Sequence, residues 1–210
     1  SWMLDRPRTA HTGDMGAGVR VPTYVSGPSS HGWWAMVITL IVAGMIALLA
    51  GFSYVFLWSR SPQDWTAPPP ATGPCLILGA DLIGALLAWL SCKALSLDRP
   101  RSPAVATLLM LAAAAALGAA WWIDLTGWID AGLKASATGQ GATVFALLSW
   151  HGFFMGIVAL MALYAVPRLL FGHVEARRPS TFQLIALFFA YTAGQGALSP
   201  ALSALFPGAP

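Results

Sequence analysis

Charged residues are scarce in this chain. Only 9% of its 210 residues are Asp, Glu, Lys or Arg, whereas 57% are apolar. A soluble domain carries roughly a quarter charged residues, so the composition excludes a soluble globular protein. The charges are also unevenly placed, because none falls between Arg20 and Arg60 or between Lys134 and Arg168. This is the composition of a polytopic membrane protein.

Cysteine and histidine are scarce too. Cys75 and Cys92 are the only cysteines, and on one helix they would lie about 25 Å apart, beyond disulfide reach. The chain lacks HxxxH, ExxH and CxxC spacings, and His151 alone of four histidines lies well inside an apolar run. Ligation of a haem by His151 alone is the one arrangement left open. We therefore expect no haem, copper or other metal in this chain, and no nucleic-acid partner.

Five apolar runs are each long enough to cross the hydrocarbon layer, which takes about 20 helical residues. Clusters of Pro, Gly and charged residues separate them and are expected to end the helices. An all-α membrane bundle with five transmembrane helices is predicted. The predicted spans are Trp33–Trp58, Cys75–Leu95, Ala104–Ile123, Ala142–Val166 and Phe182–Phe206.

The basic residues predict the orientation, because Lys and Arg are retained on the cytoplasmic side of short loops. Nine of the eleven fall on the side of the N-terminus, and only Arg60 and Lys134 fall on the other. The N-terminus is thus predicted to be cytoplasmic and the C-terminus outside. Five tryptophans near the outer span ends are interpreted as interface anchors: Trp58, Trp65, Trp121, Trp122 and Trp128.

Residues 1–30 contain scattered charges, glycines and prolines without a helical period, and are predicted to form a cytoplasmic arm. Residues 31–210 would form the transmembrane domain. Nothing before the first apolar run resembles a cleavable signal peptide. Ser1 is compatible with loss of an initiator Met and equally with a junction to a longer precursor.

Small residues and prolines give weaker indications of packing. Gly152 and Gly156 form a GxxxG step, and Ala112, Ala116 and Ala120 form a small-residue stripe, both typical of close helix contacts in lipid. Pro200 is interpreted as a kink followed by a short helical continuation.

Polar side chains inside the spans are the candidates for chemistry, since each is costly in lipid. Asp81 lies about two turns into the second span, and Asp124 lies at the outer end of the third. Gln195 is a further buried polar candidate in the last span. Asp81 can be a proton-linked carboxyl, or it can simply pair with a neighbouring helix or a water.

Two segments carry a family resemblance. Residues 24–39 read YVSGPSSHGWWAMVIT, and residues 139–153 read GQGATVFALLSWHGF. With the five spans, they resemble the minimal five-helix form of haem-copper oxidase subunit III, and most closely the version fused behind subunit I. The resemblance covers roughly residues 24–206 and is weaker through the second and third spans.

The chain departs from the family at its ionisable positions. The acidic residue that the family usually has in its first common helix falls at Ala43, and the second His of its His-Gly-x-His step falls at Phe154. The last helix, which commonly carries Trp-His-x-x-Asp, reads Tyr191-Thr-Ala-Gly-Gln195. These changes put in doubt any family role that needs a buried carboxylate or imidazole, and leave scaffold and lipid-holding roles.

The resemblance implies a non-catalytic, lipid-binding subunit of an aerobic haem-copper terminal oxidase in the bacterial inner membrane. Subunit I, subunit II and phospholipids would be its partners, and haem and copper would lie in the partner subunits. A lipid-filled cleft would separate its helices and pass oxygen towards subunit I. Candidate lipid-binding residues are Trp33, Trp34, His151, Arg168, Arg177 and Arg178.

Two other functions stay open from the sequence. One is a small transporter or channel that uses Asp81, Asp124 and His151 as polar pore residues. The other is a scaffold subunit of an unrelated respiratory or photosynthetic complex. The three arginines also have an ordinary explanation, namely retention of basic residues on the cytoplasmic side.

Overall fold

The computed structural model describes residues 12–14, 20–22, 31–67, 69, 72–97, 101–172 and 180–208. Five stretches of helix are long and apolar enough to cross a membrane, which confirms the predicted all-α transmembrane bundle. In chain order the elements are β1 (Thr12–Asp14), β2 (Arg20–Pro22), α1 (His31–Arg60), the short 3₁₀-helix η2 (Pro62–Asp64), α2 (Thr72–Ser96), α3 (Ser102–Asp130), α4 (Gly139–Leu170), α5 (Ser180–Gly196) and α6 (Leu198–Leu205).

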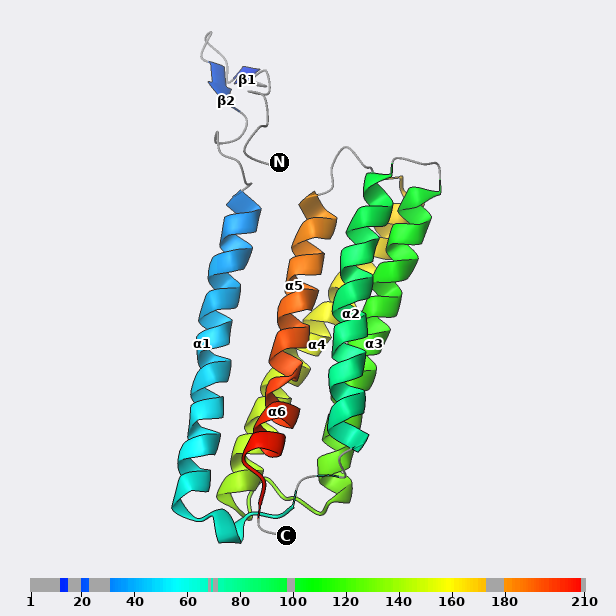
Figure 1. The fold of residues 1–210 in the computed structure, drawn as a ribbon. Coiled ribbons are helices and arrows are strands. Elements are labelled where there is room, and N and C mark those ends of the chain that lie inside the picture. Colours follow the sequence, from blue (N-terminus) through cyan, green and yellow to red (C-terminus); the bar gives the residue numbers. More distant parts are fainter. Residues whose placement is uncertain are drawn as a thin grey trace.

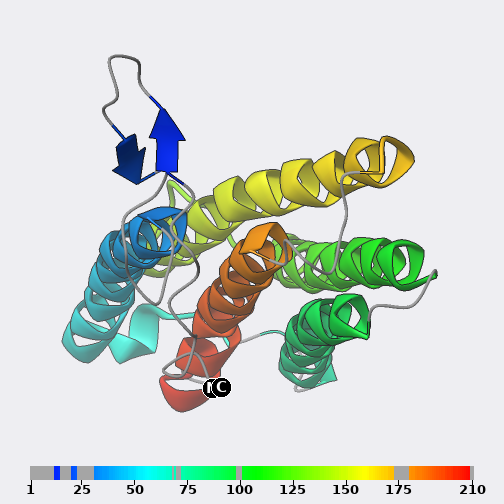
Figure 2. The same cartoon turned by 90° about the horizontal axis from the view of Figure 1, so that it is seen from above.

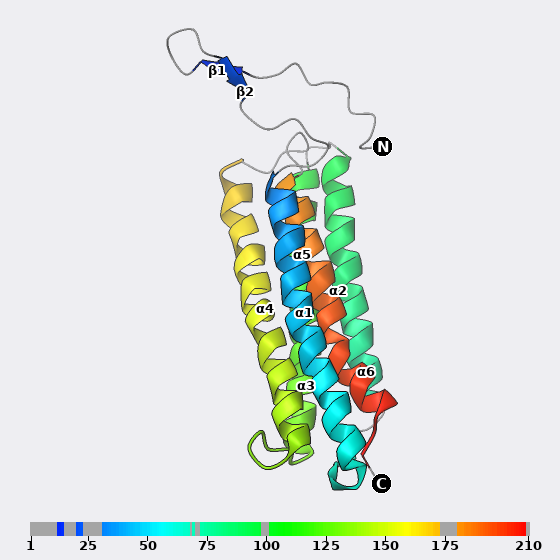
Figure 3. The ribbon, with the colours of Figure 1, turned by 90° about the vertical axis from the view of Figure 1, so that its left-hand side faces the viewer.

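The long helices run up and down between two faces of the bundle (Figure 1). We call the face where α1 and α5 begin the N-terminal face, and the face where α6 ends the C-terminal face. Seen from above, α5 lies centrally, with α1 on one side and the antiparallel pair α2 and α3 on the other (Figure 2). Helix α1 contacts α4, α5 and α6. Figure 3 shows α1 in front of α5.

Helix α1 is attached to the bundle along one narrow stripe. Leu40, Ala43, Ala47 and Tyr54 are buried, at the three- and four-residue spacing of a single helix face. The other faces of α1 expose large apolar side chains, as expected for a helix surrounded by lipid or by another membrane protein. Among these side chains are Ile41, Met45, Leu48, Leu49 and Phe52.

Small residues allow α2 and α3 to approach closely. A Cβ atom added at Gly84 of α2 would lie 2.7 Å from two carbon atoms of Leu117 on α3. The buried alanines of α3 are Ala106, Ala113 and Ala120, so the predicted stripe is wrong at two positions: Ala112 is exposed and Ala116 only half-buried. Alanine fills every position from 112 to 116, so the pattern could not show which of them face a neighbour.

Two polar contacts tie α2 to its neighbours near the N-terminal face. The Ser91 hydroxyl donates to the Ala106 carbonyl on α3 over 2.8 Å. The Cys92 thiol donates to the Phe182 carbonyl on α5 over 3.3 Å. Both acceptors lie near the starts of their helices, so these contacts fix the position of α2 along its axis relative to α3 and α5.

The last span is bent where the sequence predicted a kink. Helix α5 ends at Gly196, Ala197 forms a turn, and α6 continues from Leu198. Pro200 has no N–H to offer the Gly196 carbonyl, and its ring crowds that carbonyl, so a straight helix cannot pass this point.

The predicted interface tryptophans divide into two groups. Trp65 and Trp128 are buried in a core next to the C-terminal face, where Trp65 packs edge-on against Tyr54 at 4.6 Å between ring centroids. Trp122 is 60% exposed, as an interface anchor would be. The anchor interpretation is therefore wrong for Trp65 and Trp128, which are packing residues.

Of the predicted arm, only Thr12–Asp14 and Arg20–Pro22 are described. They pair antiparallel as β1 and β2, with Gly13 opposite Val21. This short pairing was not expected from the sequence, because neither segment shows an alternating pattern.

Candidate functional site: a buried polar cluster

Asp81 lies inside α2 and is 2% exposed. Neither of its carboxylate oxygens has a hydrogen-bond partner among the described residues. An unpaired carboxylate in a membrane span carries a large desolvation cost, so an Asp at such a place is a candidate for function.

Asp81 and His151 both lie close to Gly196, at the bend between α5 and α6. A Cβ atom added at Gly196 would overlap the Cε1 atom of His151 and would lie 2.8 Å from Oδ2 and 3.1 Å from Oδ1 of Asp81. The absence of a side chain at this position is therefore what lets α2 and α4 present these two groups to the same point of α5.

His151 is 4% exposed on α4, and its Nε2 atom has no partner in the described part of the chain. The imidazole therefore faces the interior of the bundle beside Asp81. No ion pair between the two side chains is present within the described residues, although both lie beside Gly196.

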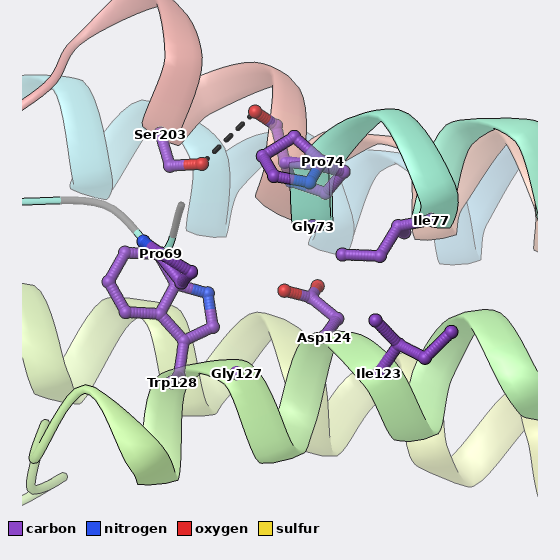
Figure 4. A pocket seen from close by; sticks show the side chains of 10 residues that line it. Pro69, Gly73, Pro74, Ile77, Ile123, Asp124, Gly127, Trp128 and Ser203 are labelled. Carbon is purple, nitrogen blue, oxygen red and sulfur yellow. Dashed lines mark hydrogen bonds between the residues drawn. The ribbon is translucent and has the colours of Figure 1, made fainter. Parts of the chain in front are cut away.

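Asp124 lies on α3, 4% exposed, beside a cavity of about 120 Å³. Its carboxylate points from α3 towards the start of α2, between Pro74 and the Trp128 indole (Figure 4). The indole of Trp128 and the hydroxyl of Ser199 lie close to this carboxylate. Nevertheless, Oδ2 of Asp124 and Oγ of Ser199 lack hydrogen-bond partners among the described residues.

Gln195, next to Gly196 in the sequence, is another buried polar side chain. It is 7% exposed at the end of α5, and neither its amide nitrogen nor its amide oxygen is hydrogen-bonded within the described ranges. We call Asp81, Asp124, His151 and Ser199 the polar cluster; all of them except Ser199 were polar candidates in the sequence.

Other predicted site residues lie elsewhere. Trp33 and Trp34 stand at the start of α1, with ring centroids 5.1 Å apart, and Trp34 is 52% exposed. Arg168 lies near the end of α4, with its guanidinium 5.8 Å from the Tyr164 ring centroid. The structure does not bring these residues next to the buried His151. Arg177 and Arg178 lie outside the described residues.

A second polar arrangement, missed by the sequence analysis, involves Gln140 at the start of α4. Its side-chain oxygen accepts from the backbone N–H and the hydroxyl of Thr66, at 2.9 and 2.8 Å, and its amide donates to the Thr66 carbonyl at 3.0 Å. Both polar atoms of this side chain have partners, in contrast to the polar cluster, so its role is structural. An isolated Gln beside glycines gives no signal that it binds a distant loop.

The described residues contain no group of three or more His, Cys, Asp or Glu side chains arranged to hold a metal ion. No family model, curated protein or solved structure matches the chain.

Proposed function

We propose that this multi-pass membrane protein is a non-catalytic, lipid-binding subunit of an aerobic haem-copper terminal oxidase, equivalent to subunit III. Oxygen reduction and proton translocation belong to partner subunits in this proposal, with the bacterial inner membrane as its location. Its supports are the five spans and the two sequence segments that resemble that family.

The observation that carries the proposal is where the family's ionisable landmarks fall. Ala43, Phe154 and the last-helix segment stand at those positions, and they come from three separate helices. Phe154 packs against Tyr191 with ring centroids 5.4 Å apart, and a Cβ atom at Gly44, next to Ala43, would lie 3.6 Å from Tyr191. Landmarks that act together in a family are expected to converge, and here Ala43, Phe154 and Tyr191 meet in one core cluster.

The exposed side of α1 suits such a subunit. Only a narrow stripe of α1 contacts the rest of the chain, and the remaining apolar surface is free to pack against lipid or against helices of another subunit. In lipid, helix association depends on close packing of complementary surfaces, and a rigid exposed helix provides one.

The test is to purify the tagged chain from its native membrane in mild detergent. A partner with haem-copper absorption is expected at fixed stoichiometry, whereas the chain separated from it is expected to show no Soret band. An unrelated five-span protein with the same tag controls for unspecific capture. Purification of the chain without a haem-bearing partner, or a stoichiometric haem in the separated chain, would contradict the proposal.

A specific observation favours the transporter alternative: Asp81, Asp124 and His151 gather in one buried cluster. The isolated chain in proteoliposomes decides between the two functions. Flux of a solute or ion that is lost in Asp81→Asn supports a transporter. No flux above that of Asp81→Asn vesicles leaves the oxidase subunit as the better account.

A further inference from the structure

Unpaired polar groups of four helices lie close together at the bend of the last span. Asp81 comes from α2, Asp124 from α3, His151 from α4 and Ser199 from α6, and all four are at least nine-tenths buried. Buried polar groups in proteins are nearly always hydrogen-bonded, and an unpaired one indicates a water or an ion at the site. Here each of these side chains has at least one unpaired polar atom in the described structure.

The charges in this cluster do not cancel. The titratable groups that face Asp81 are Asp124 on α3, which is coupled to it electrostatically, and His151 on α4. Helix α6 contributes the neutral Ser199. The described basic residues stand at helix ends, in loops or in β2, away from the cluster: Arg20, Arg60, Lys93, Arg101, Lys134 and Arg168.

Two carboxylates and one imidazole cannot all be neutralised by pairing with one another. Protonated His151 compensates one carboxylate, and the second carboxylate still needs a proton or hydration, because a bare charge in a membrane interior is too costly. The cluster must therefore bind at least one proton. That proton can be gained or lost only through water that reaches the cluster.

The cavity beside Asp124 provides access for water. Its volume of about 120 Å³ is ample for several water molecules, which need polar partners in the wall. Asp124 and Ser203 supply polar groups in its wall, and Ile77, one helical turn before Asp81, lines it as well (Figure 4). It lies between the start of α2, the end of α3 and α6, which is the half of the bundle next to the C-terminal face.

We propose that the polar cluster is a hydrated proton-binding site, in which water enters by this cavity and Asp81 and His151 exchange a proton through it. In the exchange, the Asp81 carboxyl releases a proton to a bridging water, which passes one of its own protons to Nε2 of His151. This leaves a carboxylate and an imidazolium, and the reverse step restores the neutral pair. The site does not depend on the oxidase or the transporter function.

Infrared difference spectroscopy of the full chain in lipid nanodiscs tests this site. Between two pH values, a carbonyl band of a protonated carboxylic acid is expected to appear, to shift in D₂O because the proton exchanges, and to shift again when aspartate is ¹³C-labelled. Asp81→Asn should remove the band. Asp130→Asn, which alters an exposed carboxylate at the end of α3, is the matched control and should leave it unchanged.

A pair of variants at Ser203 tests the water path separately. Ser203→Leu fills the cavity and is expected to slow the D₂O shift of the band at least tenfold, whereas Ser203→Ala removes the same hydroxyl and leaves the space open, so it should keep the native rate. Size-exclusion profiles and circular dichroism confirm that each variant is folded.

Four results would overturn the site. These are a carboxyl band that is absent or insensitive to pH, a band that does not shift in D₂O, equal exchange rates in Ser203→Leu and Ser203→Ala, and loss of the band on adding Na⁺ at constant pH. The last result would instead make the cluster a metal-cation site. The labelled native chain decides the first two results even where Asp81→Asn does not fold.

Discussion

The side-chain amide of Gln140 forms three hydrogen bonds with Thr66 and thereby connects the loop after α1 to the start of α4. Two of these bonds engage the backbone of Thr66, next to the buried Trp65. The loop thus holds Trp65 in the core at the C-terminal face.

Gln140→Ala is expected to destabilise the bundle, because it leaves the part-buried backbone N–H and carbonyl of Thr66 without their partner. Unsatisfied groups of this kind cost about 1–3 kcal/mol each when buried, and water will satisfy part of the need here. Thermal unfolding in detergent measures the effect. Gln63→Ala, at an exposed position on the same loop, is the control. Equal melting temperatures for the two variants would show that the Gln140–Thr66 hydrogen bonds do not stabilise the bundle.

The two glycines of the GxxxG step should respond differently to alanine. A Cβ atom at Gly152 would lie 2.9 Å from the Trp121 ring, whereas at Gly156 nothing lies within 4 Å. Gly152→Ala should therefore cost about 1–3 kcal/mol through overpacking, while Gly156→Ala should be neutral or stabilise the helix by up to about 1 kcal/mol. Thermal melts of the two variants compare them. A larger loss at Gly156 would mean that this glycine packs against another protein.

The orientation of the chain in the membrane is predicted from its basic residues, of which nine fall on the side of the N-terminus and two on the other side. Cys75→Ala and Cys92→Ala first remove the native thiols. In that background, Ser136→Cys should react with an impermeant reagent added outside intact cells, and Leu97→Cys should react only after lysis. Both positions are exposed, on opposite faces of the bundle. Labelling of both from the same side would refute the five-span arrangement, and exchanged sidedness would refute the orientation.

Arg168, Arg177 and Arg178, which the sequence places between the fourth and fifth spans, are expected to hold an anionic phospholipid. Each guanidinium near a charged headgroup layer gains about 1 kcal/mol, and its fork geometry suits a phosphate. Replacing Arg168, Arg177 and Arg178 by Gln should lower the number of phospholipids that native mass spectrometry counts after delipidating purification. Arg60→Gln, at the opposite face, is the control. Equal retention in both would leave these arginines only their topological role.

The sequence predicted the spans well, because a run of about twenty apolar residues rarely forms anything other than a transmembrane helix. It underestimated α3, whose predicted end at Ile123 lies seven residues before the observed end at Asp130. Asp124, Thr126 and Gly127 read locally as a turn, yet the helix continues through them. Its buried face there carries Asp124 and Trp128 against α2 and α6, and this burial outweighs the weak local preference.

The candidate site was predictable in its members and not in its arrangement. Asp81, Asp124, His151 and Gln195 stand out individually, because polar residues in spans are rare. The close approach of Asp81 and His151 depends on Gly196 and on the bend that Pro200 imposes. Which glycine faces which helix is set by packing between distant segments, and no local pattern in one sequence reports it.

The stretch after α6 is attached to the end of the first span. The Trp58 indole donates to the Pro207 carbonyl over 2.9 Å, the Tyr54 hydroxyl donates to the Phe206 carbonyl over 3.3 Å, and a Cβ atom at Gly208 would overlap the carbonyl oxygens of Trp65 and Thr66. These contacts join the two ends of residues 54–208 without a covalent bond. A force applied to the stretch after α6 would reach α1 before it loosened α6, so the bundle should yield to pulling in one abrupt event rather than helix by helix.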